Sequence, residues 1–254
     1  MPPSETPVLI VNADDLGWNT GATDLTIESF RAGRITSATA LVHMEDSDRA
    51  VQLALEHDLP TGLHLNLTDP FTSVSVPIAE RERQASACEH FAGKRLRLRS
   101  WVYDPRLARL VDDAIRDQVE RFESLFGRPP THVDGHNHVQ VCPNVVASKA
   151  LDGFKLRNAL RAWPATKSTM GAARALRRFL TARSFLSTRY FFDIAELHRL
   201  HPAVEVARRL SISRGASVEV MAHPGFGHEL EALSSPAWKS TIDDLPLGSY
   251  LDLS

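Results

Sequence analysis

The stretch V-L-I-V-N-A-D-D-L-G, residues 8–17, carries an apolar run directly into two adjacent carboxylates. The run predicts a short buried strand over Val8–Asn12, with polar residues just past its end. Like charges side by side at a strand end repel each other unless a partner offsets the repulsion. Asp14 and Asp15 are therefore the first candidates for a functional site, although A-D-D-L-G also fits a turn with an aspartate helix cap.

Strand and helix patterns alternate along the rest of the chain. Further strand patterns lie at Thr36–Val42, Thr61–Leu67, Thr131–Val139 and Ser217–Met221. Helical patterns lie between them at 21–33, Asp46–Asp58, Pro105–Phe126 and Ala203–Ser213. This alternation predicts an α/β fold with parallel strands. We expect an irregular TIM-like (β/α) barrel, and a doubly wound open sheet is the alternative that pattern alone leaves open.

No repeat, low-complexity tract or linker divides the chain, so we expect one domain over 1–254. Residues 69–104 show no clear period and predict a long excursion, a kind of segment that often acts as a lid. The basic run G-K-R-L-R-L-R-S within it is interpreted as a solvated edge. A basic helix with a solvated face is expected within Lys167–Phe192.

Composition excludes several classes of partner. The chain of 254 residues is 43% hydrophobic and 24% charged with a formal net charge of -2, which gives no electrostatic reason to expect nucleic acid or an anionic membrane. No apolar run approaches the roughly 18 residues of a membrane span, and M-P-P-S-E-T-P is unlike a signal peptide. Cys88 and Cys142 are interpreted as free thiols. We therefore expect a cytoplasmic protein.

Aspartate or histidine follows four of the predicted strands. These residues are Asp14 and Asp15, His64, the series His132, Asp134, His136 and His138, and His223. In a parallel α/β barrel the carboxyl ends of the strands meet at the active site, so these side chains are expected to converge. Taken singly, His64 also fits a hydrogen-bonded core histidine, and His223 before Pro224 also fits a simple strand end.

The series H-x-D-x-H-x-H, residues 132–138, is the strongest single signal. On an extended segment, alternation places His132, Asp134, His136 and His138 on one face. Burying unpaired imidazole and carboxylate groups costs several kcal/mol, and a bound metal would offset that cost. Carboxylate and imidazole ligands without thiolate suit Zn, Mn, Co or Ni, with Mg as a further candidate. A second, unligated carboxylate would be free to act as a base.

The motifs together resemble the YdjC/ChbG/HpnK-type carbohydrate deacetylase family, and the resemblance runs nearly end to end. The matching elements are L-I-V-N-A-D-D-L-G at 9–17, R-I-T-S-A-T-A-L-V at 34–42, G-L-H-L-N-L-T at 62–68, F-G-R-P-P-T-H-V-D-G-H-N-H-V at 126–139, V-E-V-M-A-H-P-G-F at 218–226 and G-S-Y-L-D-L at 248–253. No single motif is specific, whereas their combination in this order is.

The resemblance implies a metal-dependent hydrolase that removes an N-acetyl group from an amino sugar on a barrel-like fold. It implies one divalent metal ion, Mg or Zn first, held by Asp15, His64 and His136. It implies Asp14 as the general base and His223 as general acid or transition-state stabiliser. Arg157, in K-L-R, is expected to orient Asp14 or the substrate, and Arg157, Asp134 and His138 are the candidate substrate-binding residues.

The chain departs from the family pattern at a few positions. Leu16 replaces the phenylalanine of A-D-D-F-G, and His136-Asn137-His138-Val139-Gln140 replaces H-H-H-V-H, so Asn137 and Gln140 are expected to change the contacts around the site. The expected partner is an N-acetylated sugar or glycoconjugate, and a homodimer is left open. Two alternatives stay open: a metal-dependent hydrolase of another amide or a phosphoester, and a non-catalytic carbohydrate- or metal-binding protein on this scaffold.

Overall fold

Six parallel strands carry the fold of the computed structural model, which describes residues 4, 6–91, 102–159 and 185–254. The strands are β1 Val8–Leu16, β2 Ser37–Ala40, β3 Thr61–Leu65, β4 Val133–Gly135, β5 Tyr190–Asp193 and β6 Ser217–Ala222. Most of their residues are buried, as expected for parallel strands covered on both faces, and β1 accordingly opens with the continuous apolar run V-L-I-V.

The strand order β4-β3-β2-β1-β6-β5 is that of a barrel opened between β4 and β5. Successive strands step around the axis in one direction, and β6 returns to pair with β1, from Val8 opposite Ser217 to Ala13 opposite Ala222. Beyond β4 the chain continues the curl, because the N–H of Arg157 donates to the carbonyl of Val133. The α/β fold with an irregular barrel is therefore confirmed, as a parallel sheet curled into a half-barrel.

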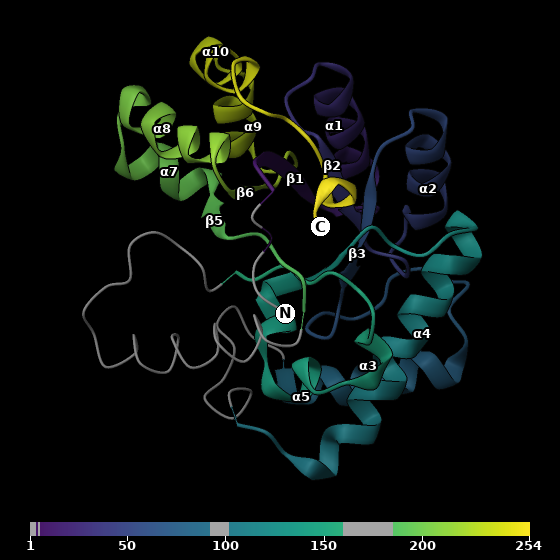
Figure 1. Cartoon of the computed structure of the whole chain (residues 1–254). Helices are drawn as coiled ribbons and strands as arrows, with labels where there is room; N and C mark the ends of the chain where they lie inside the picture. Colours follow the sequence, from purple (N-terminus) through teal and green to yellow (C-terminus); the bar gives the residue numbers. More distant parts are fainter. Residues whose placement is uncertain (1–3, 5, 92–101, 160–184) are drawn as a thin grey trace.

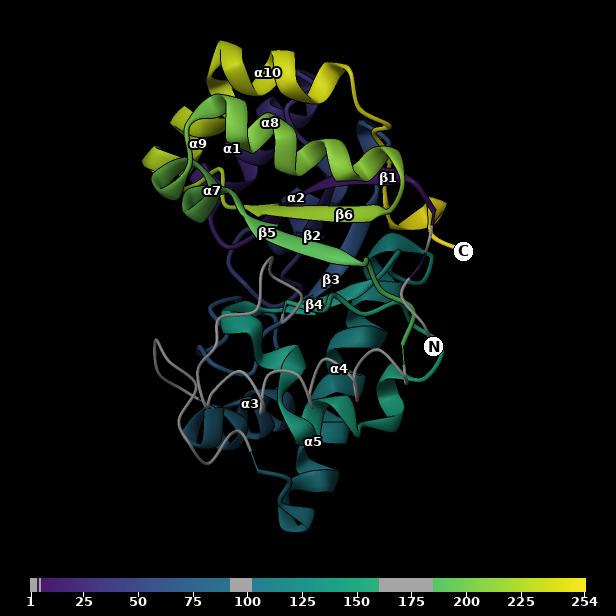
Figure 2. The ribbon, with the colours of Figure 1, turned by 60° about the vertical axis from the view of Figure 1, so that its left-hand side comes forward.

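Helices cover the outside of the strands (Figure 1). They are α1 Thr20–Arg31, α2 Ser47–Glu56, α3 Ile78–Phe91, α4 Ala108–Phe126, α5 Pro143–Val146, α7 Ile194–Leu200, α8 Ala203–Leu210, α9 Gly227–Ser234 and α10 Pro236–Asp243. Figure 2 shows α7 to α10 beside β5 and β6, whereas α3, α4 and α5 lie beside β3 and β4. The candidate functional site lies at the carboxyl ends of the strands.

Several predicted elements agree with the structure within a few residues. The helices predicted at Asp46–Asp58 and Pro105–Phe126 correspond to α2 and α4, and Gly127 ends α4 in a left-handed conformation with φ 65. The strand predicted at Ser217–Met221 is β6. Cys88 and Cys142 are not joined in a disulfide bond. No described helix combines the length and the apolar character that crossing a membrane requires.

The structure also corrects the sequence analysis. Segment 69–104 was expected to lack periodic structure, but it contains α3, whose buried stripe is only Gln84, Ala87 and Phe91, too polar to give a hydrophobic period. The strand β5 and the helices α7, α9 and α10 were not predicted. The basic run at 93–100 lies outside the described residues, as does most of the segment in which the basic helix was expected.

Candidate metal centre

Adjacent aspartates at the end of β1 face the same side of the sheet, which an ordinary strand does not allow. Asp15 has a left-handed backbone with φ 66, and the pairing of β1 with β2 shifts register between Ala13 and Leu16. Aspartate is among the few side chains that enter this region readily. The kink turns Asp15 back toward the side that Asp14 already faces, so both carboxylates reach one site.

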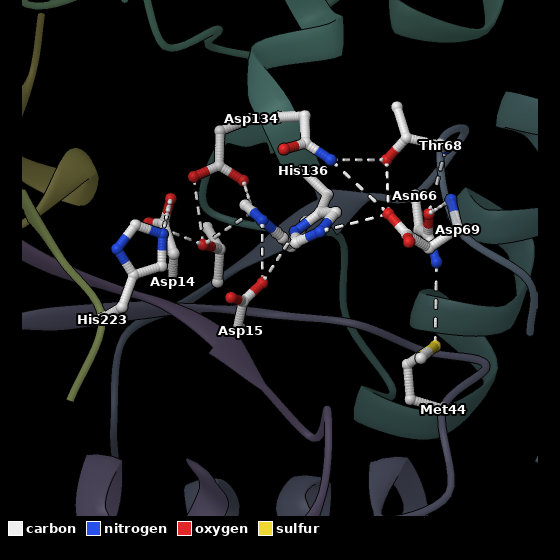
Figure 3. Close-up of polar contacts among 12 residues, drawn as sticks. Asp14, Asp15, Met44, Asn66, Thr68, Asp69, Asp134, His136 and His223 are labelled. Carbon is white, nitrogen blue, oxygen red and sulfur yellow. Dashed lines mark hydrogen bonds and ion pairs between the residues drawn. The ribbon is translucent and has the colours of Figure 1, made fainter. Parts of the chain in front are cut away.

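Asp15, His64 and His136 converge at the carboxyl ends of β1, β3 and β4 (Figure 3). Asp15 Oδ1 lies 3.3 Å from His64 Nε2 and 3.0 Å from His136 Nδ1. One ligand atom from each residue lies within 4.8 Å of the other two. One carboxylate oxygen and two imidazole nitrogens at this spacing fit a divalent cation of borderline hardness.

A second group, Asp14, His64 and Asp134, also has ligand atoms within 4.8 Å of one another. Both of its carboxylates, however, bind the guanidinium of Arg157, with contacts of 2.6 Å to Asp14 and 2.7 Å to Asp134. A cation placed among them would be repelled by the arginine. The first group therefore fits a metal, and the second is an ion-paired support.

Asp134 fixes the orientation of His64. Its Oδ1 lies 2.6 Å from His64 Nδ1, and its Oδ2 accepts a hydrogen bond from Thr39. Burial lowers the pKa of His64, but the charge and hydrogen bond of Asp134 outweigh it and raise that pKa to about 10. With Nδ1 directed at a carboxylate, Nε2 is the nitrogen presented to Asp15.

Arg157 binds three carboxylates beneath the site. It donates two hydrogen bonds to Asp14, pairs with Asp134 and donates through Nε to Glu219 at 2.7 Å. Tyr250 donates to the other oxygen of Glu219 at 2.5 Å. These five residues, Asp14, Asp134, Arg157, Glu219 and Tyr250, are all buried, and we call them the inner network.

Charge in the inner network sets the protonation of Asp14. Burial raises the pKa of Asp14, but the Arg157 guanidinium, together with His64, outweighs burial and holds that pKa well below its usual range. Burial likewise raises the pKa of Glu219 to about 7, against the opposing effect of Arg157. Asp14 is therefore ionised at neutral pH, the state in which a carboxylate accepts a proton.

His223, just after β6, stands opposite Asp14. Its Nε2 lies 4.0 Å from Asp14 Oδ2, and its Nδ1 lies 3.2 Å from both oxygens of Glu229 on α9. Burial lowers the pKa of His223, but Glu229 and Asp14 raise it to about 9. An ionised carboxylate and a protonated imidazole thus face each other beside the candidate metal ligands.

The series 132–138 does not remain on one face, which is a correction. The strand ends at Gly135, and Asn137 and His138 turn into left-handed conformations with φ 55 and φ 58. His132 lies one layer deeper in the barrel, stacked on Tyr250 with ring centroids 3.7 Å apart. Only Asp134 and His136 of this series reach the cluster, whereas His138 packs edge-on against Phe191.

The layer containing His132 depends on a glycine. A Cβ at Gly62 would lie 2.5 Å from His132 Nδ1, so any larger residue would push the imidazole out of its place. Burial lowers the pKa of His132 to about 3, which keeps the ring neutral. This residue supports the barrel beneath the site rather than joining the metal ligands.

The family model described as YdjC-like protein matches residues 8–244. The chain belongs to this family. The YdjC-like chain is 31% identical over 266 residues to a chitooligosaccharide deacetylase of Salmonella heidelberg (strain SL476), covering 97% of this chain and 99% of that protein.

A carbohydrate deacetylase of Mus musculus is 35% identical over 155 residues, covering 59% of the YdjC-like chain and about half, 48%, of the mouse protein. A solved structure from Enterococcus faecalis V583, named for cellobiose-phosphate cleavage, has a TM-score of 0.64 at 20% identity and covers 96% of this chain and 98% of its own. That likeness supports the fold.

The tentative assignment of Arg157 and Asp134 to substrate binding is not supported by the geometry. Both side chains have 0% exposure and are paired with protein groups, so they position other residues. His138 stays a candidate. Two roles were expected for Arg157, contact with Asp14 or contact with the substrate. The structure shows the contact with Asp14.

The residues of the site that the sequence analysis missed include Thr39, Asp69, Glu219, Glu229 and Tyr250. Glu219 lies inside the strand pattern S-V-E-V-M, where a buried carboxylate is a signal that we did not use. Glu229 accepts from the backbone N–H of His223 at 2.6 Å from a helix whose existence was not predicted. Thr39 and Asp69 are ordinary in type and carry no spacing signal.

Proposed function

We propose that the chain is a metal-dependent hydrolase that removes an N-acetyl group from an amino sugar. One observation carries the proposal: the candidate ligands Asp15, His64 and His136 lie beside Asp14 and His223, whose Oδ2 and Nε2 atoms are 4.0 Å apart. The names of the relatives support a carbohydrate N-deacetylase over hydrolysis of another bond.

The donor set fits one divalent ion, held by Asp15, His64 and His136. When bound, such an ion supplies a Lewis acid that polarises the acetamide carbonyl and makes water a better nucleophile. Zn and Mg are the first candidates, and Mn, Co and Ni are the alternatives.

The residues of the chain perform the proton transfers. Asp14 accepts a proton from water as the water oxygen bonds to the acetamide carbon. His223 then donates its proton to the nitrogen as the C–N bond breaks, and acetate and a free amino sugar leave. Arg157 holds Asp14 through two hydrogen bonds, so the base cannot rotate away from His223.

Two aromatic rings at the rim suit a sugar. Trp18 lies against His136 with ring centroids 5.0 Å apart, and the half-exposed Phe226 lies 5.1 Å from His223. Apolar and aromatic walls with a few polar groups are common in small-molecule sites. An N-acetylated sugar or glycoconjugate is the proposed substrate. The cytoplasmic location, a homodimer and the lid role of 69–104 stay predictions.

A screen of N-acetylated sugars for acetate release, with metal analysis on the same protein sample, tests the proposal. We expect acetate release that a chelator abolishes and added metal restores. Phosphate release from phosphoesters without acetate release would indicate the other hydrolase. Bound metal with no hydrolysis of any substrate would indicate the non-catalytic binding protein.

A matched pair of variants tests the ligand set. His136→Ala should lower the metal content, because it removes one of three ligands. His138→Ala, two residues along the same loop, should keep it. Equal metal content in both variants would contradict the assignment of His136.

A further inference from the structure

Asp69 lies on the far side of His136 from Asp15 (Figure 3). The Nδ1 atom of His136 is 3.0 Å from Asp15 Oδ1, and its Nε2 atom is 3.3 Å from Asp69 Oδ2. The imidazole is thus held between two carboxylates. Asp69 belongs to the loop after β3, whereas Asp15 lies near the end of β1, so two separate segments determine where this ring lies.

The other candidate histidine ligand has the same arrangement. His64 directs Nε2 at Asp15 and Nδ1 at Asp134. Histidine ligands of metals usually direct their second nitrogen at a carboxylate or carbonyl, which fixes the ring orientation. Asp134 serves His64 in this way, and Asp69 stands in the corresponding place beside His136.

The loop that carries Asp69 is held in place by side-chain bonds to its backbone. Asn66 Oδ1 accepts from the backbone N–H groups of Thr68 at 3.2 Å and Asp69 at 3.0 Å. Gln118 of α4 bonds both the N–H and the carbonyl of Asn66, and Gln84 of α3 donates to the carbonyl of Asp69 at 2.8 Å. These bonds fix the backbone from which the Asp69 carboxylate projects.

Hydrogen bonds also hold the carboxylate of Asp69 in place. Thr68 Oγ1 donates to Asp69 Oδ2 at 2.9 Å, and Asn137 Nδ2 donates to Thr68 Oγ1 at 3.0 Å and lies 3.5 Å from Asp69 Oδ2. Asn137 is exposed and has a left-handed backbone with φ 55. Asn137 is also a position at which the chain departs from the family pattern.

We propose that Asp69 is a positioning residue that holds His136 in the orientation needed to bind the divalent ion. The proposal rests on the proposed metal-dependent function and deepens it, because it names a carboxylate that serves His136 as Asp134 serves His64. Thr68 and Asn137 hold Asp69 in turn, so the loop after β3 and the loop after β4 together set the affinity for the ion.

The test compares metal affinity in the full chain and its Asp69→Asn variant, by competition of Zn²⁺ or Co²⁺ with a chromogenic chelator. Loss of a carboxylate that orients a histidine ligand typically weakens metal binding by about 10–100-fold. We expect that loss in Asp69→Asn, with partial recovery in Asp69→Glu. The turnover lost at low metal should return at excess metal, with the KM for the sugar unchanged.

Asp58→Asn is the matched control. Asp58 is an exposed aspartate just before β3, at the strand end opposite Asp69, and its φ of 52 suits asparagine. This variant should bind metal as the wild type does. Asn137→Ala, which removes the amide that holds Thr68 and Asp69, is a second variant and should weaken metal binding less than Asp69→Asn.

The outcomes separate this proposal from the proposed function. Unchanged metal affinity in Asp69→Asn and Asn137→Ala, in a wild type that binds metal, would overturn the role of Asp69 alone. A raised KM with unchanged affinity would overturn it too, because Asp69 would then contact the sugar. A wild type that binds no Zn²⁺ or Co²⁺ would overturn the metal-dependent function and the role of Asp69 with it.

Discussion

The inner network and the more exposed residues beside it, Asp69, His136 and His223, which we call the rim, hold similar charged groups in different surroundings. Arg157 and Glu219 have 0% side-chain exposure, and Asp14 has 2%. His136 has 18% exposure, His223 has 19% and Asp69 has 40%. The inner charges bind one another, whereas the rim residues keep atoms open to solvent. Burial alone does not distinguish ligands from supporting residues, because the proposed ligand His64 has 1% side-chain exposure and the proposed positioning residue Asp69 has 40%.

Asp14 belongs to the inner network and also faces His223 of the rim. Its replacement should have the largest effect on turnover. Asp14→Asn removes the proposed base, and loss of general base catalysis typically lowers kcat by about 10²–10⁴-fold. Metal content should stay at the wild-type level, because Asp14 is not a proposed ligand. Steady-state kinetics and metal analysis on one sample check this, and wild-type turnover in the variant would refute the base assignment.

The inner network should fail if its arginine is removed. Arg157→Met leaves three carboxylates buried without their cation, and breaking a buried pair typically costs about 3–5 kcal/mol in the free energy of unfolding. Urea unfolding measures this loss. Arg208→Met, in an exposed pair with Glu205 on α8, should leave the unfolding midpoint close to wild type. Equal midpoints for both variants would contradict the comparison.

Tyr250 offers a smaller change within the same network. Tyr250→Phe removes the O–H that donates to Glu219 and leaves the stack on His132 in place. A hydrogen bond to a charged group contributes about 1.5–3 kcal/mol. We expect a loss of that size in the free energy of unfolding with metal affinity unchanged. A loss of metal affinity instead would mean that the network controls the rim directly.

The smallest expected effect concerns the rim. Glu229 helps to raise the pKa of His223 to about 9, so the proposed acid is protonated below that pH and its activity falls as pH rises through about 9. Glu229→Gln should move this alkaline limb of kcat/KM down by about one pH unit. The exposed Glu231→Gln on the same helix should not move it. An unmoved limb in Glu229→Gln would show that Glu229 does not tune His223.

The same shift affects stability with a definite sign. The folded-state pKa of His223 lies above its ordinary value, so its contribution to stability is fully present below the ordinary value of about 6.5 and is lost as pH rises through about 9. Glu229→Gln should reduce this pH dependence of the free energy of unfolding without abolishing it, because Asp14 and Asp15 also raise the pKa of His223. Unfolding curves at pH 6 and pH 10 for the two proteins compare the contribution directly.

The candidate metal ligands could be predicted from sequence better than the inner network. Asp15, His64 and His136 come together because parallel strands place their carboxyl ends at one edge, a rule that needs only the strand pattern. The family resemblance implied the contact of Arg157 with Asp14, but the contact with Glu219 could not be predicted, because Glu219 lies mid-strand and meets Arg157 only through tertiary packing. Helix α3 was missed for a related reason: its buried face includes the polar Gln84.

The left-handed backbone at Asp15 has a consequence for how this site can be lost. Asparagine adopts that conformation as readily as aspartate does, and the two have the same shape. An Asn at position 15 should therefore keep the kink at the end of β1 while removing the anionic ligand. Because one nucleotide separates the codons of Asp and Asn, a folded variant that lacks the proposed Asp15 ligand is a single mutation away.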